Sequence, residues 1–209
     1  MAVVGDPNSG KSVFSRYLHT ILKKAIPESW LLDCDIASPT PDWFISLCLA
    51  DRNNEAVLLR KKTKVSWTHD YEELCAQRIR NTKRKLRLVI ADFPGGDFRC
   101  SPPTLIPLGR EVMFNEADYF IILGKKGYPQ IMNAWHQELA ALGRKEQIIA
   151  ELESDAPNAK IGLQFSPEPS DVLRGSAFGL DRTASIEYSS GLNTQPILTK
   201  ILGLFDHRR

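Results

Sequence analysis

The residues Gly5-Asp6-Pro7-Asn8-Ser9-Gly10-Lys11-Ser12 match the pattern GxxxxGK[ST] in full. They follow an apolar run, residues 2–4, and precede the clearest amphipathic pattern in the chain. Glycines at both ends of the stretch can adopt backbone angles closed to other residues, so successive N–H groups can point inward at an anion. The stretch also opens a helix, whose amino-terminal end attracts phosphate. The sequence therefore predicts a loop that binds the phosphates of a nucleotide.

Residue types within this loop predict separate roles. We expect Lys11 to reach the β- and γ-phosphates and the Ser12 hydroxyl to ligate Mg²⁺. The backbone from Gly5 to Ser12, continued by Val13, is expected to hold the phosphate chain. The predicted ligands are therefore ATP and Mg²⁺. The alternative interpretation is a glycine-rich turn in which the lysine occurs by chance and binds nothing.

Two alternating carboxylates, Asp33 and Asp35, end the apolar run at residues 30–32. On a strand they project to the same face. Beside a phosphate-binding loop, one carboxylate can hold the metal shell and the other can orient or deprotonate water. We predict that Asp35, ahead of Asp33, positions the water, and that Asp35 is also a candidate metal ligand. Solvated aspartates at the end of a strand are the alternative.

A second apolar run, residues 88–91, ends in Asp92-Phe93-Pro94-Gly95-Gly96. Asp92 is expected to bind Mg²⁺ directly or through water, because Mg²⁺ keeps several waters and takes few carboxylates. Gly95 or Gly96 can turn a backbone N–H toward the γ-phosphate, as switch loops do. A strand followed by a simple Pro-Gly turn is the alternative.

Apolar runs alternate with amphipathic stretches, which is typical of a parallel sheet covered by helices. Candidate strands are residues 1–4, 29–32, 86–91, 119–123, 160–165 and 184–188, with 57–59 as an additional candidate. Candidate helices are residues 10–24, 71–85, 130–142, 144–154 and 198–205. We predict an α/β fold, a three-layer α/β/α P-loop NTPase with a mostly parallel sheet. Residues 1–209 are expected to form a single domain.

Composition narrows the class of protein. The 209 residues are 43% hydrophobic and 25% charged, with a net charge of +2, so bulk electrostatics does not favour nucleic acid or a membrane. No apolar run approaches the roughly 20 residues of a membrane span, and no signal peptide is visible. Cys34, Cys48, Cys75 and Cys100 form no CxxC pair, so we expect reduced thiols in a cytoplasmic protein.

The three motifs in this order resemble the SIMIBI class of P-loop proteins. That class includes MinD/ParA-type ATPases, dethiobiotin synthetase-like enzymes and cobyrinate-synthase ATPases. The resemblance covers residues 1–123 and implies a parallel sheet, ATP in most branches and dimerisation in many. Asp6 departs from the pattern, since MinD/ParA-type loops carry a signature lysine there. The GTPase motif Asn-Lys-x-Asp is absent from the sequence, which weakens GTP as the ligand.

A narrower resemblance rests on Gly5 to Ser15, the Asp-x-Asp strand and Phe-Pro-Gly-Gly. These residues resemble the AAA-labelled ATPase modules fused to CRISPR-associated ring nucleases. That resemblance implies antiviral defence through cyclic-oligonucleotide signalling. Because only four residues precede Gly5, fewer than a central strand usually has, we also expect the chain to be one module of a longer protein.

Other features leave alternatives open. Arg78, Arg80, Lys83, Arg84, Lys85 and Arg87 form one basic stretch, and residues 60–64 form another. Aromatic residues are not interleaved with them, so a solvated helix face is favoured over a nucleic-acid site. Arg99 and Arg110 are candidate arginine fingers. Trp43 and Phe44 are candidates to cover a base or acceptor, with a local core contact favoured.

The predicted function is Mg²⁺-dependent ATP binding and hydrolysis, coupled to a conformational change in a partner or fused module. One alternative is a small-molecule kinase or ATP-dependent ligase of the dethiobiotin-synthetase type. Another is a module that senses nucleotide without hydrolysing it. The expected partners are the nucleotide and either further copies of the chain or a fused or separate protein module.

Overall fold

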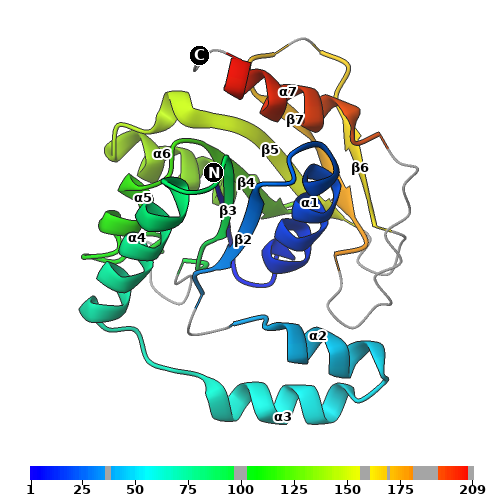
Figure 1. Ribbon diagram of the computed structural model, residues 1–209. Helices are drawn as coiled ribbons and strands as arrows, with labels where there is room; N and C mark the ends of the chain where they lie inside the picture. Colours follow the sequence, from blue (N-terminus) through cyan, green and yellow to red (C-terminus); the bar gives the residue numbers. More distant parts are fainter. Residues whose placement is uncertain (36–38, 97–102, 156–160, 169, 181–192, 207–209) are drawn as a thin grey trace.

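Seven strands form one sheet in the computed structural model, which describes residues 1–35, 39–96, 103–155, 161–168, 170–180 and 193–206 (Figure 1). They are β1 (Ala2–Gly5), β2 (Ser29–Asp33), β3 (Leu88–Asp92), β4 (Phe120–Lys125), β5 (Ile148–Asp155), β6 (Gly162–Phe165) and β7 (Leu173–Phe178). Their order is β2-β3-β1-β4-β5-β7-β6, and all neighbours are parallel except β6 and β7. The predicted α/β fold with a mostly parallel sheet is confirmed.

Helices lie on both faces of this sheet. The helices of the described chain are α1 (Lys11–Ala25), α2 (Asp42–Leu49), α3 (Asn53–Thr63), α4 (His69–Lys83), α5 (Glu111–Asn115), α6 (Pro129–Ala141) and α7 (Gln195–Asp206). α1 and α7 pack on one face, and α4, α5 and α6 pack on the other. Along β4, Ile121 and Leu123 point into the core beneath α1 and α7. Phe120 and Ile122 point into the core beneath α4, α5 and α6. The predicted three layers are therefore present, with the sheet buried on both faces.

The helix α1 follows from its apolar spacing. Phe14, Tyr17, Leu18 and Leu22 recur three or four residues apart and are all buried against the sheet. Lysines in the last turn complement the negative end of the helix dipole. This helix therefore anchors one end of the phosphate-loop motif to the core.

The chain reverses its direction of winding between the neighbouring strands β1 and β3. These two strands are neighbours, but α1 follows β1 on one face of the sheet and α5 is the first helix after β3 on the other. Ligands of open α/β sheets bind where neighbouring strands lead to opposite faces. Both predicted phosphate-site motifs directly follow these two strands.

Helices α2 and α3 form a hairpin that stands off the carboxyl-terminal end of the sheet (Figure 1). Its small core consists of Phe44, Cys48 and Ala56. Several of its larger apolar side chains remain exposed, namely Trp43, Leu49, Val57, Leu58 and Leu59. The hairpin therefore packs mainly on itself.

Some predicted elements were wrong. Residues 144–154 are not a helix, because only Lys145–Gln147 forms a short 3-10 turn before β5 begins at Ile148. Residues 57–59 are not a strand but lie within α3, where all three side chains are exposed. Helices α2, α3 and α5 and strands β5 and β7 were not predicted. The predicted strand at residues 184–188 lies outside the described residues. Within the described part of the chain, no helix is both long and apolar enough to cross a membrane.

Removing buried volume from α1 is expected to destabilise the fold. Leu18 is fully buried, so Leu18→Ala leaves a cavity and should lower the free energy of unfolding by about 2–5 kcal/mol. Leu108 is 95% exposed, so the same change there should stay within about 0.5 kcal/mol. Urea denaturation of both variants measures the difference. Equal losses at the two positions would contradict the assignment of α1 to the core.

Candidate functional site

Two glycines allow the phosphate loop its shape. Gly10 has φ 87°, and a Cβ there would lie 2.5 Å from Cβ of Leu180. Gly5 has φ 151°, and a Cβ there would lie 1.9 Å from the Leu123 carbonyl oxygen. Real Cβ atoms do not approach other atoms so closely. Asn8 is also left-handed, with φ 62°, a conformation that asparagine tolerates. The loop therefore has a backbone that other residues at Gly5 and Gly10 would disrupt.

Lys11 is folded into the loop. Its side chain is buried, and its Nζ donates a hydrogen bond of 2.9 Å to the Asp6 carbonyl oxygen. The lysine charge therefore already faces the interior of the loop, where the sequence predicts phosphate.

Asp92 lies at the centre of the site. Its carboxylate hydrogen-bonds the Ser12 side chain, and its Oδ1 is buried without a hydrogen-bond partner among the described residues. Burial, followed by the nearby charge of Asp33, raises the pKa of Asp92 to about 7, while Lys11 and Ser12 oppose this rise. The charge of Asp35 raises the pKa of Asp92 slightly further. The structure therefore brings the three predicted carboxylates together.

Asp33 holds the turn after β2. Its Oδ1 accepts the backbone N–H of Asp35 at 3.1 Å, and its Oδ2 accepts that of Thr40 at 2.8 Å. Burial raises the pKa of Asp33, and these two backbone hydrogen bonds oppose the rise. Its Cα is paired with that of Asp92 on the neighbouring strand. Both oxygens of Asp33 are thus engaged, whereas Asp35 is half-buried beyond the end of the strand.

The segment after β3 packs closely on the phosphate loop. A Cβ on Gly95 would lie 2.9 Å from the backbone nitrogen of Pro7. A Cβ on Gly96 would lie 2.6 Å from Cδ2 of Leu105. Glycine is therefore required for this close approach at both positions. A movement of this segment would be transmitted directly to the loop.

Two other loop side chains are buried with unpaired polar atoms. Oδ1 of Asp6 and Oγ of Ser9 have no hydrogen-bond partner among the described residues. Burial raises the pKa of Asp6, and the charges of Lys11 and Lys125 oppose the rise. Buried polar groups without partners are costly, so their presence at a concave loop favours a polar ligand there.

Several contacts at the site had no signal in the sequence. A guanidinium nitrogen of Arg16 hydrogen-bonds the Thr40 carbonyl oxygen, and Thr40 in turn donates to Asp33. Leu180, just beyond β7, packs against Gly10. The Cys34 thiol, between Asp33 and Asp35 in the sequence, is hydrogen-bonded to Cys75 of α4, and this contact together with burial raises the pKa of Cys34.

Two secondary candidates have other roles in this conformation. Arg110 lies 3.4 Å from Glu72, and its Cζ is 4.2 Å from the centre of the Trp67 ring. It is therefore held in a cluster with α4. Arg99 lies outside the described residues. Phe44 belongs to the small core of the α2–α3 hairpin, whereas Trp43 is exposed beside it.

No group of three or more histidine, cysteine, aspartate or glutamate side chains suited to a metal occurs in the described ranges. Mg²⁺ in nucleotide sites needs fewer, because one or two carboxylates, waters and substrate phosphates complete its shell. The Ser12 hydroxyl, hydrogen-bonded to the buried Asp92 carboxylate, would supply the protein's share of such a Mg²⁺ shell.

Comparisons with family models, with curated proteins and with solved structures gave no match for this chain.

The raised pKa of Asp92 predicts a pH-dependent cost to folding. Because its folded pKa of about 7 exceeds the unfolded value, the ionised carboxylate destabilises the native state as pH rises from 4 to 7. Asp92→Asn should therefore match wild type near pH 4 and exceed it by about 2–4 kcal/mol at pH 8 without divalent cations. Urea denaturation across this range tests it.

The matched control for that titration is Asp171→Asn, which makes the same change at an exposed position. Its difference from wild type should not vary over the same pH range. If both variants follow one pH profile, the buried carboxylate is not the group responsible.

Proposed function

We propose that this chain binds a Mg²⁺–nucleoside triphosphate, with ATP as the preferred nucleotide, and hydrolyses it. The observation that supports this most directly is the hydrogen bond between Ser12 and buried Asp92, beside Lys11 in a glycine-dependent loop. A buried carboxylate with an unpaired oxygen is costly unless a cation compensates it. Mg²⁺ with phosphates would compensate it.

In this proposal the loop holds the phosphates through its backbone N–H groups and through Lys11. Ser12 and Asp92 would hold Mg²⁺, with Asp35 as a further ligand directly or through water. When bound, Mg²⁺ neutralises charge on the phosphates. Binding of the cation would also release the proton that Asp92 retains near neutral pH.

The water-positioning role falls to Asp35. Asp33 has both oxygens occupied by backbone N–H groups, so it holds the turn that presents Asp35. Asp35 is less buried than Asp92 and lies close enough for its charge to raise the pKa of Asp92. Gly95 and Gly96 would sense the γ-phosphate because Gly95 lies against Pro7 of the phosphate loop.

The α2–α3 hairpin supports coupling to a conformational change. It follows the Asp33 turn in sequence and stands off the same end of the sheet (Figure 1). Arg60 of α3 donates to the Pro39 carbonyl oxygen at 2.7 Å, and Thr40 beside it donates to Asp33. A change at Asp33 would therefore reach the hairpin, which could then act on a further copy, a partner or a fused module. CRISPR-associated cyclic-oligonucleotide signalling as the setting rests on the sequence resemblance alone.

A small-molecule kinase or ligase is the second candidate. The observation that favours it is the position of the same hairpin, which can carry an acceptor site next to Asp35. A nucleotide sensor without turnover is the third candidate, and it differs only in the absence of hydrolysis.

The deciding experiment measures phosphate release from ATP and GTP with Mg²⁺ and no added acceptor. Turnover of ATP should fall at least about 100-fold in Lys11→Ala, because the variant loses the cation facing the phosphates. Lys62→Ala removes an exposed lysine of α3 and should leave turnover unchanged. Turnover retained in Lys11→Ala would contradict the proposal. Nucleotide binding without turnover would favour the kinase or sensor.

Substitutions of Asp33 and Asp35 should affect ATP binding and ATP turnover differently. Asp35→Asn should lower kcat at least about 10-fold with little change in KM for ATP, because only the water-positioning group is lost. Asp33→Asn, which disturbs the turn, should raise KM and lower stability as well. If Asp33→Asn and Asp35→Asn lowered kcat equally and changed nothing else, Asp35 would not be the water-positioning residue and Asp33 would not be the one that holds the turn.

A further inference from the structure

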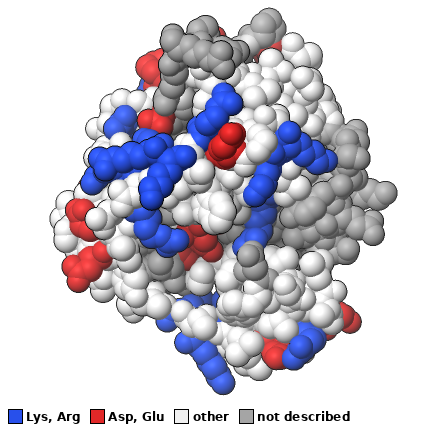
Figure 2. Space-filling view, viewed as in Figure 1, with Lys and Arg blue, Asp and Glu red and all other residues white. Residues whose placement is uncertain are grey.

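The amino-terminal end of the sheet, opposite the phosphate loop, carries a basic surface. It comprises the end of α1, the α4–β3 turn and the start of β3, with the exposed residues Lys23, Lys24, Arg84, Lys85 and Arg87. Figure 2 shows Lys and Arg side chains gathered over α4 and its junction with the sheet. Since α1 has 15 residues, this surface lies about 20 Å from the phosphate loop. It is therefore a separate feature.

The cations of the basic surface differ from their neighbours on α4 in their ion pairing. Arg80 and Lys83 of α4 form ion pairs, with Glu116 and Asp118 respectively. In contrast, none of the five residues of the basic surface forms an ion pair with a described residue. A dense group of unpaired positive charges repels itself, so it favours an anionic partner.

An exposed aromatic ring lies beside the basic surface. Trp30 is 51% exposed on β2, the edge strand of the sheet. It is in register with Val89 of β3, two residues beyond Arg87. The tryptophan comes from a different element than the basic stretch of α4, so its proximity was not visible in the sequence. Cations next to an exposed ring are the combination on which nucleobases stack.

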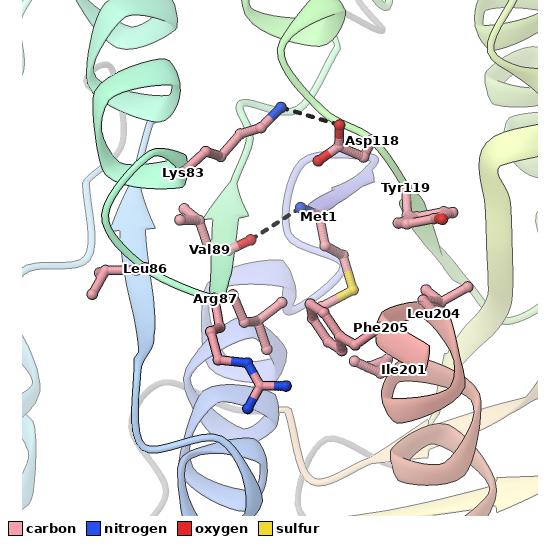
Figure 3. A pocket seen from close by; sticks show the side chains of 11 residues that line it. Met1, Lys83, Leu86, Arg87, Val89, Asp118, Tyr119, Ile201, Leu204 and Phe205 are labelled. Carbon is pink, nitrogen blue, oxygen red and sulfur yellow. Dashed lines mark hydrogen bonds and ion pairs between the residues drawn. The ribbon is translucent and has the colours of Figure 1, made fainter. Parts of the chain in front are cut away.

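A hollow opens at the same end of the sheet (Figure 3). Its volume is about 80 Å³, and its walls include Arg87, Tyr119, Phe205 and the Lys83–Asp118 ion pair. The Cζ of Arg87 lies 5.9 Å from the centre of the Phe205 ring. A guanidinium, two aromatic rings and aliphatic walls suit a flat, partly apolar group attached to an anionic chain.

We propose that this surface binds single-stranded nucleic acid. Arg84, Lys85 and Arg87 would contact backbone phosphates, Trp30 would stack on one base, and the hollow would receive another. A duplex keeps its bases stacked inside and would leave both the ring and the hollow unused. An acidic protein would pair with the cations but would have no specific use for the hollow beside Arg87.

The test measures fluorescence anisotropy of labelled single-stranded RNA and DNA oligonucleotides of about 15 nucleotides at several salt concentrations. The double variant Arg84→Gln/Lys85→Gln should weaken binding about 10-fold and reduce the slope of log K against log salt by about 1.4. Trp30→Ala should weaken it about 5- to 100-fold. All three positions are exposed, and thermal unfolding verifies that the variants remain folded.

Matched controls separate this site from general attraction of charge. Lys61→Gln/Lys62→Gln removes the same charge from α3 and should change affinity less than 2-fold. Lys11→Ala should bind the oligonucleotide like wild type, so failure of the nucleotide proposal leaves this one intact. Heparin, a polyanion without bases, should be insensitive to Trp30→Ala. The proposal would be overturned if both double variants lost the same oligonucleotide affinity, or if Trp30→Ala affected heparin and RNA binding equally. It would also be overturned if the protein did not bind the oligonucleotides at low salt.

Discussion

The hydrogen bond between Ser12 and Asp92 is the contact on which the arrangement of the candidate site depends. It joins the first turn of α1 to the end of β3, two elements that the strand order places side by side. Gly10, at φ 87°, makes the turn from the loop into α1, whose first turn carries Ser12. A buried carboxylate beside a second one, Asp33, costs stability, and Lys11 offsets only part of that cost. Such a cost is typical of positions shaped for a cation rather than for the fold alone.

From that contact the site extends through Asp33. Because Asp33 accepts two backbone N–H groups, the segment after β2 is fixed relative to Asp92. Arg16 of α1 contacts the same segment at Thr40, so the helix that carries Lys11 and the strand that carries Asp33 meet there again. The α2–α3 hairpin is tied to this junction by Arg60. A ligand that changes the charge near Asp92 therefore acts on a connected set of contacts and not on one residue.

How far the sequence predicted these features depended on how local each one is. The phosphate loop and Asp92 were visible because strand, glycines and charged residues follow one another directly in the chain. The contact of Leu180 with Gly10 was not, because it joins segments 170 residues apart. Residues 144–154 were misassigned because Glu and Leu favour helices, whereas Ile148 and Ile149 begin a strand buried in the sheet. Trp30 looked like an ordinary strand residue because nothing local shows that β2 lies at the edge.

The carboxylates of the candidate site lie at the carboxyl end of the sheet, and the basic surface lies at the amino end. The topology explains only part of this separation of charge. Helices that follow parallel strands begin at the carboxyl end of the sheet and end at the amino end. Carboxylates at the carboxyl end and cations at the amino end therefore complement the helix dipoles. Lys23 and Lys24, in the last turn of α1, fit that explanation. Arg84 is the C-cap residue of α4 and can still complement its dipole, whereas Lys85 and Arg87 lie beyond the end of the helix. Arg80 and Lys83 of α4 form ion pairs with Glu116 and Asp118, whereas these three residues form none with a described residue, and we therefore propose that this part of the basic surface contacts the anionic partner.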